Sequence, residues 1–133
     1  NVMSALEKVQ SIYTAFGRGD VPAILETISP DVSWEHGAQD HGVPWLKPGR
    51  GLAHVGAFFQ VVGTQLDIKH FDVQQLYAAG DQVIAQIEIE LVVKATGKTV
   101  KDLELHHWRF GADGKVQAFR HIVDTHQHLL ATR

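Results

Sequence analysis

The sequence predicts an α+β domain in which helices cover one face of a bent antiparallel sheet. Two observations lead to this fold class. Apolar residues recur at helical spacing in much of the first half of the chain, and at a period of two after about residue 66. The second half is also divided by short glycine-containing turns at 79–81, 96–98 and 112–114. The expected order is helix, helix, strand, helix and then an antiparallel meander of four strands.

Two helices are expected before the first strand. Residues 4–17 carry apolar side chains at helical spacing, and Ser4 followed by Glu7 is a capping-box pattern at the start of this segment. Asp20 and Pro22 then begin a second, short helix, because both residue types favour the first positions of a helix.

A short strand, a long loop and a third helix follow. Residues 32–36 alternate, so we expect Trp34 and His36 to lie on the same side of that strand. Residues 37–51 contain four glycines and two prolines and predict a loop. Because long loops in compact domains often form lids or pocket rims, this segment is expected to border a pocket, with His41 able to close over a ligand. The third helix is expected over 52–66.

The four strands of the meander are expected near 68–78, 82–95, 99–110 and 115–125. Side chains two residues apart on a strand share a face. The sets expected to share a face within a strand are Ile87 with Ile89, Glu104 with His106 and Trp108, and Phe119 with His121 and Val123.

Length and composition limit the function classes. The chain has 133 residues, which fits a single domain over 1–133; Met3, the sole methionine, is expected to be the native start, and Asn1 and Val2 are set aside. With 12 basic against 15 acidic side chains, nucleic acid is not an expected partner. The absence of cysteine excludes disulfides and thiol chemistry. No apolar run is long enough for a membrane span or a signal core, so we expect no membrane partner and a cytoplasmic location.

Three segments resemble the nuclear-transport-factor-2-like superfamily, in particular its SnoaL-like and ketosteroid-isomerase-like branches. They are IYTAFGRGD at 12–20, SPDVSWEH at 29–36, and HWRFGADGKV at 107–116 followed by Phe119-Arg120-His121. The resemblance implies a cone-shaped α+β barrel, in which a curved mixed or antiparallel sheet wraps around three helices and encloses a largely apolar pocket. It also implies a homodimer. The superfamily includes isomerases, cyclases, dehydratases, epoxide hydrolases and non-catalytic domains, so the fold alone does not give the function.

The resemblance also assigns positions to individual residues. His36 stands where ketosteroid isomerase has its general-base aspartate, and His106 stands at its oxyanion-hole aspartate. His121 matches the acidic residue on the last strand of SnoaL-like cyclases. The oxyanion tyrosine of the first helix aligns with Ile12. We do not expect Tyr13 to replace it, because one helical step turns a side chain by about 100°.

Other departures from the family pattern argue against two known reactions. Epoxide hydrolases of this superfamily need an arginine and an aspartate on the long strand where this chain has Ile87 and Ile89. The histidines at 36 and 106 and the missing tyrosine argue against steroid isomerisation by the family mechanism.

The predicted site is therefore an apolar pocket with a few converging polar groups. We expect His36 and His121 to transfer protons, His106 to bind or polarise an oxygen, and Glu104 to orient His106. The expected lining residues are Phe16, Trp34, Trp45, Phe58, Phe59, Ile87, Ile89, Trp108, Phe119 and Val123. The predicted function is acid–base catalysis, of the isomerase, dehydratase or cyclase type, on a small apolar molecule without a cofactor.

Two alternatives remain open at the level of the sequence. Three imidazoles could hold a divalent metal such as Zn²⁺. The one pair of histidines with the close spacing typical of metal ligands, His126 and His128, lies beyond the last expected strand and so away from the predicted pocket. The pocket could also be a binding module without catalysis, with its histidines hydrogen-bonded to one another or to Glu104.

Overall fold

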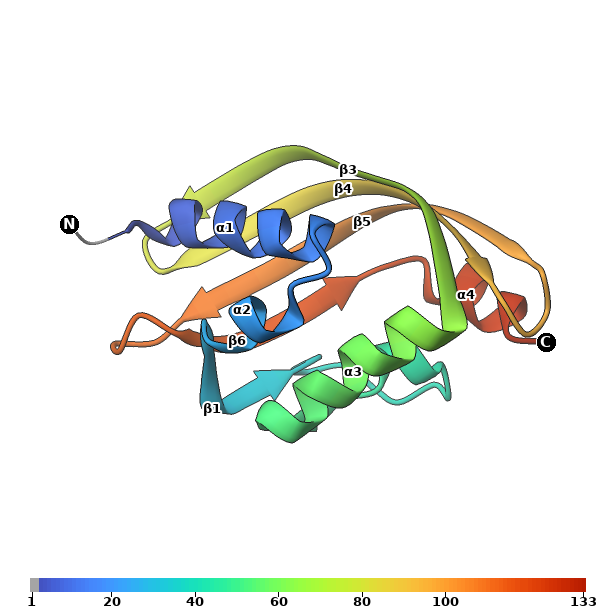
Figure 1. Ribbon diagram of the computed structural model, residues 1–133, viewed down its shortest axis with the longest axis horizontal. Coiled ribbons are helices and arrows are strands. Elements are labelled where there is room, and N and C mark those ends of the chain that lie inside the picture. Colours follow the sequence, from blue (N-terminus) through green and yellow to red (C-terminus); the bar gives the residue numbers. More distant parts are fainter. Residues whose placement is uncertain (1–2) are drawn as a thin grey trace.

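A six-stranded sheet with the order β2-β1-β6-β5-β4-β3 forms the frame of the protein (Figure 1). The computed structural model describes residues 3–133, and the interpretation of Asn1 and Val2 lies outside them. The strands are β1 (Ile28–Trp34), β2 (Gly49–Arg50), β3 (Leu66–Ala79), β4 (Gln82–Val93), β5 (Thr99–Phe110) and β6 (Val116–Ile122). The helices are α1 (Ala5–Gly17), α2 (Val21–Leu25), α3 (Leu52–Gln65), α4 (Thr125–Ala131) and the short 3₁₀ helix η1 (Pro44–Leu46).

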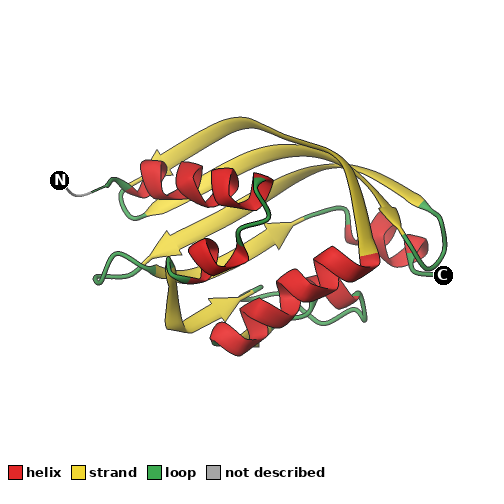
Figure 2. Ribbon diagram, viewed as in Figure 1, coloured by secondary structure: helices red, strands yellow, loops and turns green. Residues whose placement is uncertain are grey.

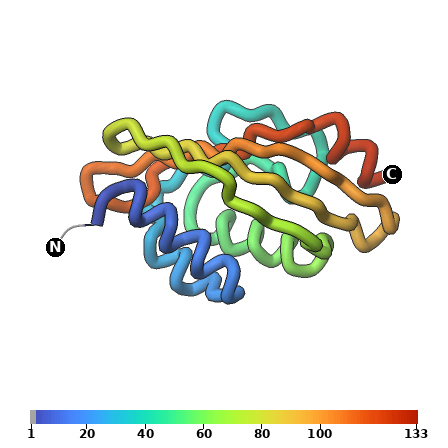
Figure 3. The backbone as a smooth tube through the Cα atoms, turned by 90° about the horizontal axis from the view of Figure 1, so that it is seen from above, coloured from blue at the N-terminus to red at the C-terminus, as the bar shows by residue number. Residues whose placement is uncertain are grey.

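The sheet is mixed and curved. Strands β3 to β6 form the antiparallel meander that the sequence predicts, whereas β1 runs parallel to β6 and antiparallel to β2. The two edge strands β2 and β3 do not pair with each other, so the sheet does not close into a barrel. Figure 2 shows α1, α2 and α3 against the concave face, and Figure 3 shows these three helices on one side of the sheet. The α+β fold class is confirmed.

Local sequence signals place the first two helices. The Ser4 hydroxyl accepts a hydrogen bond from the backbone N–H of Glu7 at 3.1 Å, and the Glu7 carboxylate accepts one from the backbone N–H of Ser4 at 3.0 Å. This is the predicted capping box, which satisfies two N–H groups that the helix leaves without partners. The Asp20 carboxylate caps α2 in the same way by accepting from the N–H of Ala23 at 3.2 Å.

The end of the chain differs from the prediction. The last strand stops at Ile122 instead of continuing to residue 125, and a fourth helix, α4, follows it. The Asp124 carboxylate accepts a hydrogen bond from the backbone N–H of Gln127 at 3.2 Å, so this residue is a helix cap and not a strand residue. Helix α4 brings His128 back against β5.

Two groups of buried apolar residues stabilise the arrangement. One joins α1, α2, β1 and α3 to the β5–β6 hairpin around Trp34, Trp108 and Phe119. The other joins the loop around Trp45 to the ends of β3, β4 and β5 and to α4. A polar site lies where these two groups meet. None of the helices within residues 3–133 is long and apolar enough to cross a membrane.

Candidate active site

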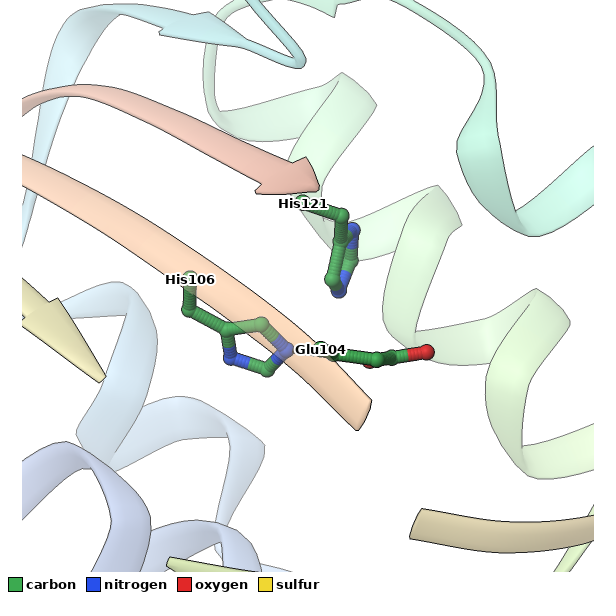
Figure 4. Close-up of side chains that lie close together, drawn as sticks. All are labelled: Glu104, His106 and His121. Atoms are coloured by element: carbon green, nitrogen blue, oxygen red, sulfur yellow. Dashed lines mark hydrogen bonds and ion pairs between the residues drawn. The ribbon is translucent and has the colours of Figure 1, made fainter. Parts of the chain in front are cut away.

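A mostly apolar cavity of about 80 Å³ lies between the concave face of the sheet and the helices. Of the residues predicted to line the pocket, the structure places eight around this cavity: Phe16, Trp34, Trp45, Phe58, Phe59, Ile89, Trp108 and Phe119. Glu104, His106 and His121 also border it. In Figure 4 the side chains of Glu104 and His106 from β5 and of His121 from β6 extend into one common space.

Three other predicted site residues lie elsewhere. Ile87 is fully buried in the sheet but does not border the cavity. Val123 borders a separate, more polar hollow next to the loop, together with His41. His36 borders neither, and its imidazole lies next to that of His107, with 6.1 Å between the ring centres.

The position of His36 follows from the backbone of Glu35, which has a φ of +59°. This left-handed conformation ends β1 after Trp34 and interrupts the strand alternation on which the prediction depended. As a result, Glu35 turns inward and His36 does not. Burial, together with His107, Arg109 and Arg120, lowers the pKa of His36.

Glu35 forms a buried pair with His121. Its side chain is 2% exposed, and its carboxylate accepts a hydrogen bond from Nδ1 of His121 and another, at 3.3 Å, from the backbone N–H of His121. Burial acts to lower the pKa of His121, but the carboxylates of Glu35 and Glu104 outweigh it and raise that pKa above its ordinary value. With Nδ1 on Glu35, Nε2 of His121 makes no hydrogen bond within residues 3–133.

A hydrogen-bonded chain runs from α1 to β5, and its direction is determined by chemistry. An indole N–H can only donate, so Trp108 donates to the Tyr13 hydroxyl at 3.0 Å. An ionised carboxylate can only accept, so Nε2–H of His106 donates to Glu104 at 3.2 Å. Nδ1 of the neutral ring is then an acceptor, and the Tyr13 hydroxyl donates to it at 2.8 Å.

A second chain reaches the same carboxylate from α4. The Trp45 indole donates to Nδ1 of His128 at 2.9 Å, which makes Nδ1 an acceptor and places the proton on Nε2. Nε2–H of His128 is then shared between Asp102 at 3.0 Å and Glu104 at 3.3 Å. The neutral Nε2–H tautomer thus follows from the Glu104 carboxylate in His106 and from the Trp45 indole in His128, with Glu104 as the common acceptor.

The pKa shifts agree with these directions. Burial raises the pKa of Tyr13 far above its ordinary value, so the hydroxyl keeps the proton that it donates. Burial alone would raise the pKa of Glu104, but hydrogen bonds from His106 and His128 lower it well below the usual range, so Glu104 is a carboxylate. Burial lowers the pKa of His106 despite the opposing effect of Glu104.

The same directions bear on the metal alternative. The donor atoms of Glu104, His106 and His121 lie within 4.8 Å of one another, and so do those of Asp102, Glu104 and His128. A histidine that binds a metal through one nitrogen usually donates the other N–H to an acceptor. In His128 the other nitrogen faces the indole N–H of Trp45, which is a donor. The hydrogen-bond directions therefore argue against a metal ion at Asp102, Glu104 and His128. At Glu104, His106 and His121 the metal alternative stays open, because Nδ1 of His121 lies on the Glu35 carboxylate, as in a metal-binding histidine.

Sequence reasoning missed four residues of this arrangement: Tyr13, Glu35, Asp102 and His128. Tyr13, which is not expected to replace the oxyanion tyrosine, borders the cavity together with Ile12, and its hydroxyl contacts His106. Asp102 was within reach of the alternation argument, since it precedes Glu104 by two residues on the same strand. The signal for His128 was the helix cap at Asp124.

The family profile of the SnoaL-like domain matches residues 9–119. The chain belongs to the SnoaL-like domain family. Its fold is similar to that of an NTF2-like protein from Burkholderia xenovorans LB400, with 23% identity over 100% of both chains and a TM-score of 0.86. An NTF2-like protein from Burkholderia thailandensis E264 has 27% identity over 99% of both chains and a TM-score of 0.85. TerC, co-crystallised with polyporic acid, has 24% identity over 96% of both chains and a TM-score of 0.79. The chain matches none of the curated proteins.

Proposed function

We propose that this SnoaL-like protein is an acid–base enzyme, of the isomerase, dehydratase or cyclase type, that acts on a small and mainly apolar molecule. The observation that carries the proposal is the buried Glu35–His121 pair at the cavity wall. Nδ1 of His121 donates to the Glu35 carboxylate, and Nε2 of His121 has no partner among the described residues. This is the arrangement by which a carboxylate orients a histidine that acts as a general base.

The proposed chemistry uses one mobile proton. Nε2 of His121 takes a proton from a carbon or hydroxyl group of the substrate, and the carboxylate of Glu35 stabilises the imidazolium that forms. His121 then returns the proton to another substrate atom. The aromatic lining keeps water away from the reacting atoms, so the charges of Glu35 and Glu104 act at low dielectric.

The cavity supports a small substrate. Its volume of about 80 Å³ is less than the roughly 150 Å³ of an engineered cavity that binds benzene. A larger substrate requires movement of side chains at its border, such as Phe58 and Phe59, which are only partly buried. TerC, whose fold is similar, was co-crystallised with polyporic acid, which supports a ligand-binding role for this architecture.

One observation favours the alternative of a binding module without catalysis. Both ring nitrogens of His106 are engaged within the protein, one by Tyr13 and the other by Glu104. His106 therefore has no free N–H for a substrate oxygen, and the expected polarising role has no donor. The distinction between the two functions depends on His121 alone.

Hydrogen exchange on a ketone tests the proposal. Cyclopentanone in D₂O exchanges the protons next to its carbonyl when a base removes them, and ¹H NMR follows the loss of signal. We expect the protein to accelerate exchange. His121→Ala should lower the rate at least tenfold, because general bases contribute about 10²–10⁴-fold. The control His36→Ala should exchange at the rate of the wild type. No acceleration by the wild type, or full acceleration by His121→Ala, supports the binding module instead.

A further inference from the structure

The indole N–H of Trp34 is a buried donor without an acceptor. Trp34 is 1% exposed, borders the cavity, and its Nε1 has no hydrogen-bond partner within residues 3–133. Buried N–H groups in folded proteins are nearly always paired, and an unpaired one calls for a water molecule or a ligand.

The surroundings prevent this indole from turning towards another acceptor. Phe119 stacks on the Trp34 ring with 4.2 Å between the ring centres, and Phe58 lies at 5.3 Å. Trp108 meets the ring edge-on at 6.2 Å. The ring is thus held by aromatic contacts that would all have to change if it rotated.

The other donor groups around the cavity are already occupied. The indoles of Trp45 and Trp108 donate to His128 and Tyr13, and the donors of Tyr13 and His106 end on the Glu104 carboxylate. In the described part of the chain, Nε1–H of Trp34 is therefore the side-chain donor of the cavity residues that has no acceptor, while Nε2 of His121 and the further lone pairs of Glu104 remain as acceptors. Nε1 is itself buried, so a ligand reaches it when a partly buried neighbour such as Phe58 moves.

The charge around the cavity selects among ligands. Glu104 borders the cavity, Glu35 lies on His121 and Asp102 lies on His128, whereas no lysine or arginine of residues 3–133 borders it. A ligand carboxylate would meet these negative charges without a cation to pair with, at low dielectric. An uncharged oxygen meets no such penalty.

We propose that Trp34 donates its indole N–H to an oxygen of the ligand, and that this ligand is an uncharged carbonyl, ether or hydroxyl compound. The inference rests on the proposed function only in that both place the ligand in this cavity. Trp34 would fix the oxygen, and His121 would meet another part of the same molecule. Phe119 lies between the two groups: it stacks on Trp34 and meets His121 edge-on, with 4.8 Å between the rings of Phe119 and His121.

Two pairs of probes test this assignment in the intact protein. Methylenecyclopentane replaces the carbonyl oxygen of cyclopentanone by CH₂, and cyclopentanecarboxylate differs from the equally large cyclopentanecarboxamide in its charge. The readout is the ¹H–¹⁵N signal of the Trp34 indole, assigned by its loss in Trp34→Phe. We expect cyclopentanone to shift the proton frequency of this signal downfield and methylenecyclopentane to cause no such shift. Cyclopentanecarboxylate should bind at least tenfold more weakly than cyclopentanecarboxamide.

The variant Trp34→Phe adds a thermodynamic test. Loss of one hydrogen bond should weaken cyclopentanone binding about fivefold, while methylenecyclopentane should bind within about twofold of wild type. The inference is overturned if the ketone fails to bind, if it perturbs His121 without moving the Trp34 indole signal, or if the carboxylate binds more tightly than the carboxamide. An indole shift without catalysed exchange would contradict the proposed function alone, and exchange without an indole shift would contradict this inference alone.

Discussion

The Tyr13 hydroxyl joins Nδ1 of His106 to Nε1–H of Trp108, and neither nitrogen has another hydrogen-bond partner within residues 3–133, so Tyr13→Phe should destabilise the fold. The substitution removes the bond of 2.8 Å to His106 and the bond of 3.0 Å from Trp108. Each lost bond costs about 1 kcal/mol. The Trp108 side chain is buried, so its N–H is left without an acceptor and adds a part of the roughly 1–3 kcal/mol that an unpaired buried donor costs. The expected loss is about 2–4 kcal/mol in the free energy of unfolding.

Urea unfolding at pH 7.5 measures this difference. The matched control is Tyr77→Phe, because the Tyr77 side chain is 55% exposed and its substitution should change stability by no more than about 0.5 kcal/mol. If Tyr13→Phe is as stable as the control, the hydroxyl is not the link between Trp108 and His106.

Two further predictions follow from the same contacts, and a third concerns the oligomeric state. Trp45→Phe removes the hydrogen bond to Nδ1 of His128 while Nε2–H stays on Asp102 and Glu104, so the ¹⁵N signal of Nδ1 should move downfield, and an unchanged Nδ1 signal would contradict the role of the indole. Glu35→Gln removes the main cause of the raised pKa of His121, so this pKa should fall. Because the pair stabilises the fold below about pH 6.5 and this contribution is lost as the pH rises through the folded-state pKa, the stability gap between wild type and Glu35→Gln should be larger at pH 6 than at pH 9, and an equal gap at both would count against the pair. The homodimer remains a prediction, which sedimentation tests. The wild type should have twice the chain mass, and Leu103→Lys, which places a charge at an exposed apolar position, should be a monomer. A monomeric wild type would contradict the homodimer.

Local sequence patterns specify much of the fold. The capping box at Ser4, the cap at Asp20 and the glycine turns of the meander each specify a boundary through nearby hydrogen bonds, and the structure has elements at those places. The parallel pairing of β1 with β6 is different, because it joins segments that are far apart in the sequence. No local pattern specifies such a pairing.

The site was predicted less completely because it depends on single deviations from regular geometry. One residue with positive φ, Glu35, exchanges the inward position between itself and His36. On α1, the concave sheet surrounds enough of the helix that Ile12 and Tyr13 both border the cavity, so a rotation of about 100° does not take Tyr13 out of it. His128 lies on α4, which was not predicted because the last strand was expected to continue to residue 125.

The central claim is that the Glu35 carboxylate raises the pKa of His121, the proposed base, while burial lowers the pKa of His106. A long-range ¹H–¹⁵N NMR titration of the histidine rings in the ligand-free protein tests it most directly. His106 should show the Nε2–H tautomer and a pKa below its ordinary value of about 6.5. His121 should titrate above that value. A protonated His106 at neutral pH, or a pKa of His121 below the ordinary value of about 6.5, would contradict the account.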